Sequence, residues 1–334
     1  MFKPHQWVEA MWWQKKRPPL WLRMLEPIYA TISHSQLKRR AAAAINPPLP
    51  MISVGNITVG GSGKTPFVLW LAAELAKKGY QPVILCRGDG GKSATPSVID
   101  TSSNPNIIGD EACMMANISN MPVIAARDRV AGCNLAGTLG NIIILDDGFQ
   151  YRHLTRCCDI ILIPAEGVGN GHLIPAGPLR EPLSALQRAD LVIRTTNRPQ
   201  PTTLPLWANK EYHWLAKAGK LIDIQHTGKS KPEQMIAVTA IARPQRFFDD
   251  LASQGVTILE KKTWPDHHRF STNDVNRLLS FNQAIAVTAK DAIKLAPLWP
   301  AERPLWVLQQ QGEGPPEIVE TIIQVIKSQK NKIT

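Results

Sequence analysis

Residues 51–66 read Met51-Ile-Ser-Val-Gly-Asn-Ile-Thr-Val-Gly-Gly-Ser-Gly-Lys-Thr-Pro66, and they decide the fold. An apolar run of strand length opens the stretch, a glycine-rich loop follows, and a helix-forming run over 66–78 begins directly after the loop. Glycines let successive backbone N–H groups point at a phosphate because no Cβ intervenes, and the helix N-terminus adds positive partial charge. The stretch therefore predicts a phosphate-binding loop between a strand and a helix.

The loop predicts a nucleotide site with defined roles. Lys64 is expected to reach the β- and γ-phosphates, and the Thr65 hydroxyl is expected to bind Mg²⁺. The strict motif begins with glycine where this chain has Thr58, but three later glycines supply the flexibility. The residues expected to bind the nucleotide are Thr58, Val59, Gly60, Gly61, Ser62, Gly63, Lys64 and Thr65. A glycine-rich structural turn is the alternative.

A second apolar run ends in two acids, Asn141-Ile-Ile-Ile-Leu-Asp-Asp147. A phosphate-binding loop needs a further carboxylate for its metal ion, commonly at the end of an apolar strand. Ligand sites in open parallel sheets lie at the carboxyl edge of the strands. Asp146 and Asp147 are therefore expected to hold Mg²⁺ with Thr65, and a helix cap or a turn is the alternative.

Apolar runs and helical stretches alternate, a pattern typical of an α/β fold with a doubly wound, mainly parallel sheet of the P-loop NTPase type. Strands are expected at 51–54, 83–86, 123–125, 142–145, 160–163 and 191–193, and, after a proline-rich stretch at 196–206, at 236–239, 256–259, 284–288 and 305–308. We expect a helical segment over 1–46, a P-loop domain over 47–205 and a smaller α/β domain over 206–334. The final amphipathic helix, near 317–328, could pack back on the P-loop domain.

The first 46 residues are basic and rich in tryptophan. They hold eight Lys and Arg against two acids, in a chain of net charge +11, and four of the ten tryptophans. One helix face is expected to carry Trp21, Leu22, Leu25, Ile28, Tyr29 and Ile32, with a kink or restart at Pro27. Such composition is typical of a helix in a membrane interface, so we expect binding to an anionic membrane surface. A helix packed on the protein with a solvated basic edge is the alternative.

Other features favour a cytoplasmic chain that does not span the membrane. No run of about 18 uninterrupted apolar residues occurs, which a spanning helix needs. Glu9 and the basic residues at 15–17 interrupt any signal-peptide core. The five cysteines form no CxxC pair and no cluster with zinc spacing, so free, buried thiols are expected.

Several stretches form a specific set beyond the apolar pattern. They read Val54-Gly-Asn-Ile-Thr-Val-Gly-Gly-Ser-Gly-Lys-Thr-Pro66, Gly109-Asp-Glu111, Asp146-Asp-Gly-Phe-Gln150, Gly169-Asn-Gly-His-Leu-Ile-Pro-Ala-Gly-Pro-Leu-Arg-Glu-Pro182, Pro265-Asp-His267 and Thr288-Ala-Lys-Asp291. Over about residues 20–295, their content and order resemble the tetraacyldisaccharide 4′-kinase family, the lipid A 4′-kinases of Gram-negative bacteria.

The resemblance implies transfer of the γ-phosphate of ATP to the 4′-hydroxyl of a tetraacylated glucosamine disaccharide 1-phosphate, a lipid A precursor. It implies action at the cytoplasmic face of the inner membrane, with ATP and Mg²⁺ as cofactors. Carried over by position, Arg180 and Glu181 lie near the γ-phosphate, with Glu181 among the metal ligands. Asp110 is the implied base, paired with His267 from the second domain.

Three positions depart from the family pattern. Tyr151 stands where histidine is usual, so no catalytic role is assigned to it. Asp89 stands where an aromatic residue is common, and Cys157-Cys158 replaces an acidic-apolar pair.

Other functions fit the residues less well. A membrane-docked P-loop GTPase acting as a targeting or assembly switch needs an Asn-Lys-x-Asp element, and the candidates at 209–212 and 331–334 lack its Asp. A soluble kinase or ligase for a small metabolite leaves the basic N-terminal segment without a role. Nucleic-acid binding is not expected, because over half of the excess positive charge lies in that segment.

Overall fold

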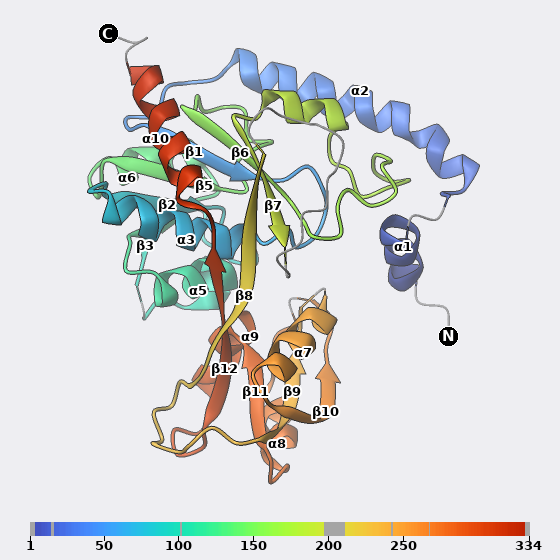
Figure 1. Cartoon of the computed structure of the whole chain (residues 1–334), viewed down its shortest axis with the longest axis vertical. Helices are drawn as coiled ribbons and strands as arrows, with labels where there is room; N and C mark the ends of the chain where they lie inside the picture. Colours follow the sequence, from blue (N-terminus) through green and yellow to red (C-terminus); the bar gives the residue numbers. More distant parts are fainter. Residues whose placement is uncertain are drawn as a thin grey trace.

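A computed structural model describes residues 4–14, 17–100, 102–196, 211–241, 243–266 and 268–330. The strands of these residues form one sheet in the order β10-β9-β11-β12-β8-β7-β6-β1-β5-β2-β4-β3. The sheet passes from an upper part, which holds the first half of the chain, to a lower part formed by the second half (Figure 1). The predicted α/β fold with a mainly parallel sheet is confirmed.

Buried apolar runs form the strands of the upper part, which are β1 (Met51–Gly55), β2 (Pro82–Cys86), β3 (Ser97–Ile99), β4 (Val123–Ala125), β5 (Ile142–Asp146), β6 (Cys158–Ile163) and β7 (Leu191–Thr196). They run parallel except β3, which pairs antiparallel with β4 at the edge. β1 lies between β5 and β6, in register with Val54 beside Asp146. The loop after β1 therefore leaves from the middle of the carboxyl edge, next to the two acids.

The second half of the chain extends the same sheet. β8 (Glu211–Asp223) runs parallel to β7 and antiparallel to β12 (Leu305–Glu313). β9 (Gln234–Thr239), β10 (Thr257–Thr263) and β11 (Ala284–Thr288) run parallel to β12. These four strands therefore point opposite to those of the upper part, and the carboxyl ends of the two sets face each other.

Neither β3 nor β8 was predicted. β8 has no apolar run longer than Trp214-Leu-Ala216: charged residues and Gly219 interrupt the rest of it. Pairing on both sides, with β7 and β12, makes this stretch a strand. The predicted domain boundary at 205–206 falls within residues 197–210, outside the described residues.

Helices cover both faces of the upper part, as a doubly wound sheet requires. α3 (Lys64–Lys77), α5 (Asp110–Ile118) and α10 (Pro316–Lys330) share one core with the sheet, and α6 (Arg129–Ala136) and the 3-10 helix η1 (Leu183–Arg188) pack on the opposite face. The final helix of the chain thus packs back on the upper part. In the lower part, α8 (Thr272–Leu279) and α9 (Ala289–Leu295) cover one face and α7 (Pro244–Ser253) the other. Two short turns complete the set, α4 (Pro105–Ile108) and η2 (Ala296–Leu298).

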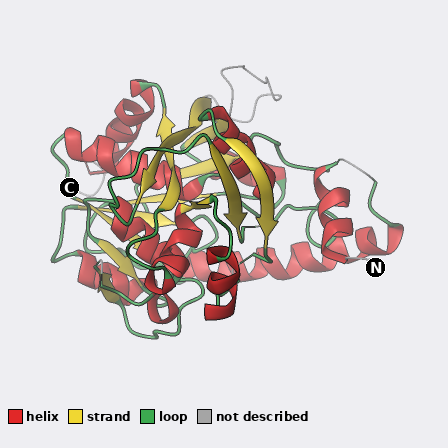
Figure 2. Ribbon diagram, turned by 90° about the horizontal axis from the view of Figure 1, so that it is seen from below, coloured by secondary structure: helices red, strands yellow, loops and turns green. Residues whose placement is uncertain are grey.

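Two helices precede the sheet, α1 (Pro4–Trp13) and α2 (Leu20–Ala42). α2 lies across the top of the upper part in Figure 1, and Figure 2 shows α1 and the start of α2 at one side of the molecule. The predicted restart at Pro27 is wrong, since α2 continues through it. Contacts of Tyr29 and Arg40 with the upper part hold the helix beyond the proline, so one missing backbone hydrogen bond is tolerated. Among the described residues, no helix combines the length and hydropathy that crossing a bilayer requires.

Candidate active site

The glycine-rich loop has the backbone that a phosphate-binding loop requires. Gly60 has φ +97° and Gly63 has φ +78°, values that other residues rarely adopt. The Val59 N–H donates to the Pro178 carbonyl at 2.8 Å, and Thr58 forms a β-bridge with Leu179. The 169–182 stretch therefore braces the loop from one side.

Three polar atoms around this loop are buried without a hydrogen-bond partner among the described residues: Asn56 Oδ1, Thr58 Oγ1 and Ser62 Oγ. Buried polar atoms are nearly always hydrogen-bonded in native proteins. Their shared position at the loop fits a site that receives its hydrogen bonds from a polar ligand.

Two cations meet one carboxylate beside the loop. Lys64 Nζ lies 3.2 Å from Asp147 Oδ1, and Arg180 Nη1 lies 3.3 Å from Asp147 Oδ2. Burial alone would raise the pKa of Asp147, but the charges of Lys64 and Arg180 outweigh it and hold that pKa below its usual value. Asp147 has φ +50°, in the left-handed region that Asp tolerates better than most residues. The turn after β5 thus aims an ionised carboxylate at the start of α3.

Asp146, the last residue of β5, lies in a different environment. Its side chain is buried and Oδ1 accepts the Asp147 N–H at 3.0 Å. Burial raises the pKa of Asp146 to about 7, with Lys64 opposing the shift and Asp147 adding to it. The pKa values of the two adjacent acids therefore move in opposite directions, because the cations outweigh burial at Asp147 and do not at Asp146.

Glu181 is buried beside Arg180 and has its own partners. It accepts hydrogen bonds from Arg188 Nη2 at 2.5 Å and from Gln150 Nε2 at 3.1 Å. Gln150 also donates to the Asn56 carbonyl at 2.9 Å. These contacts tie Glu181 to the strand-to-loop turn after β1.

Asp110 begins α5 and is buried at the junction of the upper and lower parts. Its Oδ1 accepts the Glu111 N–H at 3.0 Å, and its Oδ2 lies 3.2 Å from Nζ of Lys294 on α9. Lys290, one turn earlier on α9, lies 3.5 Å from both Glu111 and Asp266. Burial would lower the pKa of Lys290, but Glu111 and Asp266 outweigh it and raise that pKa.

The second predicted member of the base pair, His267, lies outside the described residues. Asp266, the residue before it, pairs with Lys290 of α9 at the junction. His268 has a separate contact, with Nε2 3.2 Å from Asp274 Oδ2 at the start of α8.

Both N-terminal helices contact the 169–182 stretch. The Asn170 N–H donates to the Trp12 carbonyl at 2.8 Å, and Trp12 Nε1 donates to the Pro175 carbonyl at 3.1 Å. His172 Nδ1 lies 2.7 Å from Glu26 Oε1, and the Tyr29 hydroxyl donates to the Arg180 carbonyl at 3.1 Å. The helices thus hold the stretch that carries Arg180 and Glu181.

Sequence reasoning missed Arg243, Lys294 and the contacts of Gln150. Gln150, like Lys290, lies within a stretch that resembles the family pattern, so the sequence could have indicated both residues. Arg243 and Lys294 lie outside those stretches, and only the strand order brings them near the loop and Asp110.

The residues that depart from the family pattern make ordinary contacts with their neighbours. Arg129 stacks on the Tyr151 ring with its Cζ 5.0 Å from the ring centroid, and Asp89 lies 3.3 Å from Arg87 Nε. Cys158 is buried in β6 as a small apolar residue.

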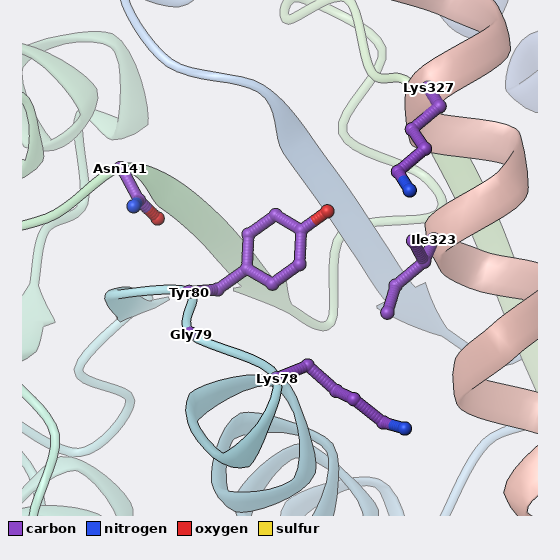
Figure 3. A pocket seen from close by; sticks show the side chains of 6 residues that line it. All are labelled: Lys78, Gly79, Tyr80, Asn141, Ile323 and Lys327. Carbon is purple, nitrogen blue, oxygen red and sulfur yellow. The ribbon is translucent and has the colours of Figure 1, made fainter.

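A pocket on the upper part lies away from these residues. It is lined by Lys78, Gly79, Tyr80, Asn141, Ile323 and Lys327 (Figure 3). Tyr80 precedes β2 and Asn141 precedes β5, so the pocket lies at the amino edge of the sheet. The phosphate loop lies at the carboxyl edge, and the pocket is therefore no part of the candidate site.

A sequence model described as tetraacyldisaccharide-1-P 4′-kinase matches residues 19–327. The chain belongs to the tetraacyldisaccharide 4′-kinase family. It is a phosphotransferase with a hydroxyl group as acceptor, as the sequence predicted, and nothing in the matches supports the GTPase alternative.

Individual members of the tetraacyldisaccharide 4′-kinase family match nearly end to end. The chain is 35% identical to the enzyme of Dechloromonas aromatica over 97% of its own length and 98% of that protein. It is 34% identical to the enzyme of Chromobacterium violaceum, over 99% and 98% of the two chains. A solved structure of LpxK from Aquifex aeolicus in complex with ATP superposes with a TM-score of 0.75 at 27% identity, covering 90% of this chain and 97% of that one.

Proposed function

We propose that this chain transfers the γ-phosphate of ATP to the 4′-hydroxyl of a tetraacylated glucosamine disaccharide 1-phosphate, at the cytoplasmic face of the inner membrane. The observation that carries the proposal is the convergence of Lys64 and Arg180 on Asp147 beside the phosphate loop. Lys64 and Arg180 bring two positive charges to the start of α3, which would offset the negative charge of a nucleotide's terminal phosphates. Family membership names the acceptor.

The residues around the loop fit a magnesium ion. Mg²⁺ is commonly held by one or two carboxylates, with waters and substrate phosphates as the remaining ligands. Asp146, Asp147 and the Thr65 hydroxyl offer that donor set, and no cluster of three or more His, Cys, Asp or Glu occurs in the part of the chain that the structure describes. When bound, Mg²⁺ offsets negative charge on the transferring phosphoryl group. Glu181 would join this set only by exchanging its hydrogen bonds to Arg188 and Gln150.

Asp110 is proposed as the base. A carboxylate accepts the proton of the 4′-hydroxyl as its oxygen attacks phosphorus, and His267 would orient or tune that carboxylate. The position of Asp110 supports this role, because it lies at the carboxyl edge of the sheet, where the two parts meet. Lys294 holds the carboxylate in place through the 3.2 Å ion pair.

Helix α2 supports docking on a membrane surface. The large apolar residues on its exposed side are Leu20, Trp21, Met24, Leu25, Ile28 and Ile32. The predicted single apolar face is wrong in part, since Leu22 is buried and Tyr29 contacts Arg180. The same helix carries Arg23, Lys38 and Arg39, which are exposed and suit an anionic leaflet.

The test is a transfer assay with radiolabelled ATP. Purified protein should label the tetraacylated disaccharide 1-phosphate, presented in mixed micelles, and leave glucosamine and glucose unlabelled. Equal labelling of the small sugars would show that the acceptor is not a lipid, and no labelling of any hydroxyl would remove the kinase assignment.

A further inference from the structure

Arg243 belongs to the lower part of the molecule, yet it reaches the phosphate loop of the upper part. It lies in the turn between β9 and α7, at the carboxyl end of β9. Because the two sets of strands point at each other, this turn faces the carboxyl edge of the upper part. A Cβ placed on Gly60 would lie 3.2 Å from Arg243 Nη2, so the guanidinium lies directly against the loop backbone.

Two side chains hold Arg243 there. The guanidinium stacks on Trp13 of α1, with Cζ 4.1 Å from the ring centroid. Arg243 Nη1 lies 3.2 Å from Oε1 of Glu166, which follows β6 at the same edge. That Nη1 is buried and makes no hydrogen bond of good geometry within the described residues. The aromatic face and the acid orient the guanidinium. A guanidinium has five N–H donors in all, so the contact with Glu166 occupies only part of them.

The position of Gly60 in the loop indicates which group of a nucleotide Arg243 would contact. It is the third residue of the loop whose N–H groups surround the terminal phosphates, and it has φ +97°. A guanidinium packed on that residue lies within reach of the terminal phosphate of a bound nucleotide. Lys64 and Arg180 approach the same site from the upper part, on the side of Asp147.

We propose that Arg243 binds the transferring phosphoryl group of ATP as a catalytic residue supplied by the second half of the chain. This inference rests on the proposed function. In the reaction the bond from γ-phosphorus to the bridging oxygen breaks and its electron pair leaves with ADP. A bond forms between phosphorus and the 4′-oxygen, whose proton passes to the Asp110 carboxylate. Arg243 stays protonated and stabilises negative charge on the phosphoryl oxygens.

The experiment compares Arg243→Ala and Arg243→Lys with Glu166→Gln and with Arg277→Ala, which is the control. Arg277→Ala removes the same charge from an exposed position on α8, and Glu166→Gln removes the acid that holds Arg243. Arg243→Ala should lower kcat by about 10²-fold or more, as loss of a transition-state donor does. Arg243→Lys should recover part of the loss. Glu166→Gln should lower kcat less than Arg243→Ala does, because the guanidinium keeps its charge and its stack on Trp13. The control Arg277→Ala should change kcat less than about threefold, the effect of a surface charge.

Binding gives a readout that does not depend on turnover. Arg243→Ala should weaken binding of a non-hydrolysable ATP analogue by about tenfold, the value of a charge-assisted hydrogen bond, and leave ADP binding unchanged. Equal weakening for ADP and the analogue, or kcat within threefold of wild type, would overturn the assignment. Lowered melting temperatures in both Arg243→Ala and Glu166→Gln, with kcat of the folded proteins within threefold of wild type, would show that Arg243 only links the start of α7 to α1 and to the turn after β6. Wild-type protein that labels no acceptor would overturn the proposed function instead.

Discussion

The ion pairs of the candidate site join side chains from different elements. Lys64 from α3 and Arg180 from the 169–182 stretch meet at Asp147 after β5, and Lys294 from α9 pairs with Asp110. Removing one member of a buried pair leaves the other charge uncompensated. Tests of single residues therefore need matched variants that separate chemistry from stability.

Lys64→Ala should lower kcat by about 10²-fold or more, because it removes charge from the site of phosphoryl transfer. The fold should persist, since Lys64 begins α3 and contributes nothing to the apolar core. Steady-state transfer rates and circular dichroism measure the two effects. Lys77→Ala, at the exposed end of the same helix, serves as the control. A Lys64→Ala rate above about a tenth of wild type would contradict the role.

Asp110→Asn separates a structural role from base catalysis. Asn can still accept the Glu111 N–H but leaves Lys294 without a counter-charge, so a purely structural role predicts lower stability with turnover little changed. A base role predicts a fall in kcat of about 10²-fold with little change in KM, because an amide cannot accept the proton. Glu111→Gln, at the half-buried neighbour that pairs with Lys290, is the matched control.

His267→Ala should also be slow, and the double variant Asp110→Asn/His267→Ala should lose less than the product of the single losses. Multiplicative losses would mean that the two residues act independently. A normal rate for Asp110→Asn would place the base elsewhere.

The pKa of Asp146 predicts how stability depends on pH. In the folded, ligand-free protein this pKa is raised to about 7 by burial, from the ordinary value of 3.8. Between these values the folded state binds a proton that the unfolded state has released, so Asp146 lowers stability as pH rises through this window. Asp146→Asn should therefore gain in melting temperature, relative to wild type, from pH 4 to pH 8. A difference that stays constant with pH would show that Asp146 is ionised when folded.

At the scale of elements, α2 serves two surfaces at once. Its inner side holds Leu22 in a small core with Met11 and Ala176, and Tyr29 contacts the Arg180 carbonyl. Its outer side carries the exposed apolar residues from Leu20 to Ile32. A helix with this division can touch a membrane while it holds the active-site stretch. Trp12 and Trp13 of α1 contact the protein itself: Trp12 donates to the Pro175 carbonyl, and Arg243 stacks on Trp13.

Replacing Trp21, Met24, Ile28 and Ile32 with Ser should weaken sedimentation with anionic vesicles, because the apolar side of an interfacial helix provides its buried area. Binding of the wild-type protein should fall as salt rises, since salt screens the attraction between the anionic lipids and Arg23, Lys38 and Arg39. Val98, Leu259 and Leu298 are exposed apolar residues elsewhere, and their replacement by Ser is the control. Unchanged sedimentation of the α2 variant would place the membrane contact elsewhere.

At the scale of the whole molecule, β8 and β12 decide the geometry. β8 continues the upper sheet beside β7, and β12 returns antiparallel to it, which reverses the direction of the lower strands. The carboxyl ends of both sets then face each other. Asp110 meets Lys294, and Gly60 meets Arg243, as a result of this reversal.

The sequence by itself determined the glycine-rich loop between β1 and α3, the acids at the end of β5 and most strands of the upper part. These features are local: the loop is a run of consecutive glycine-rich residues, and buried parallel strands are continuous apolar runs. Tertiary structure alone decided that residues 211–223 form a strand, because two neighbouring strands supply its hydrogen bonds. It also decided which residues of α2 face outward and that Arg243 and Lys294 join the site. Such contacts depend on strand order and direction, which bring together residues that lie far apart along the chain.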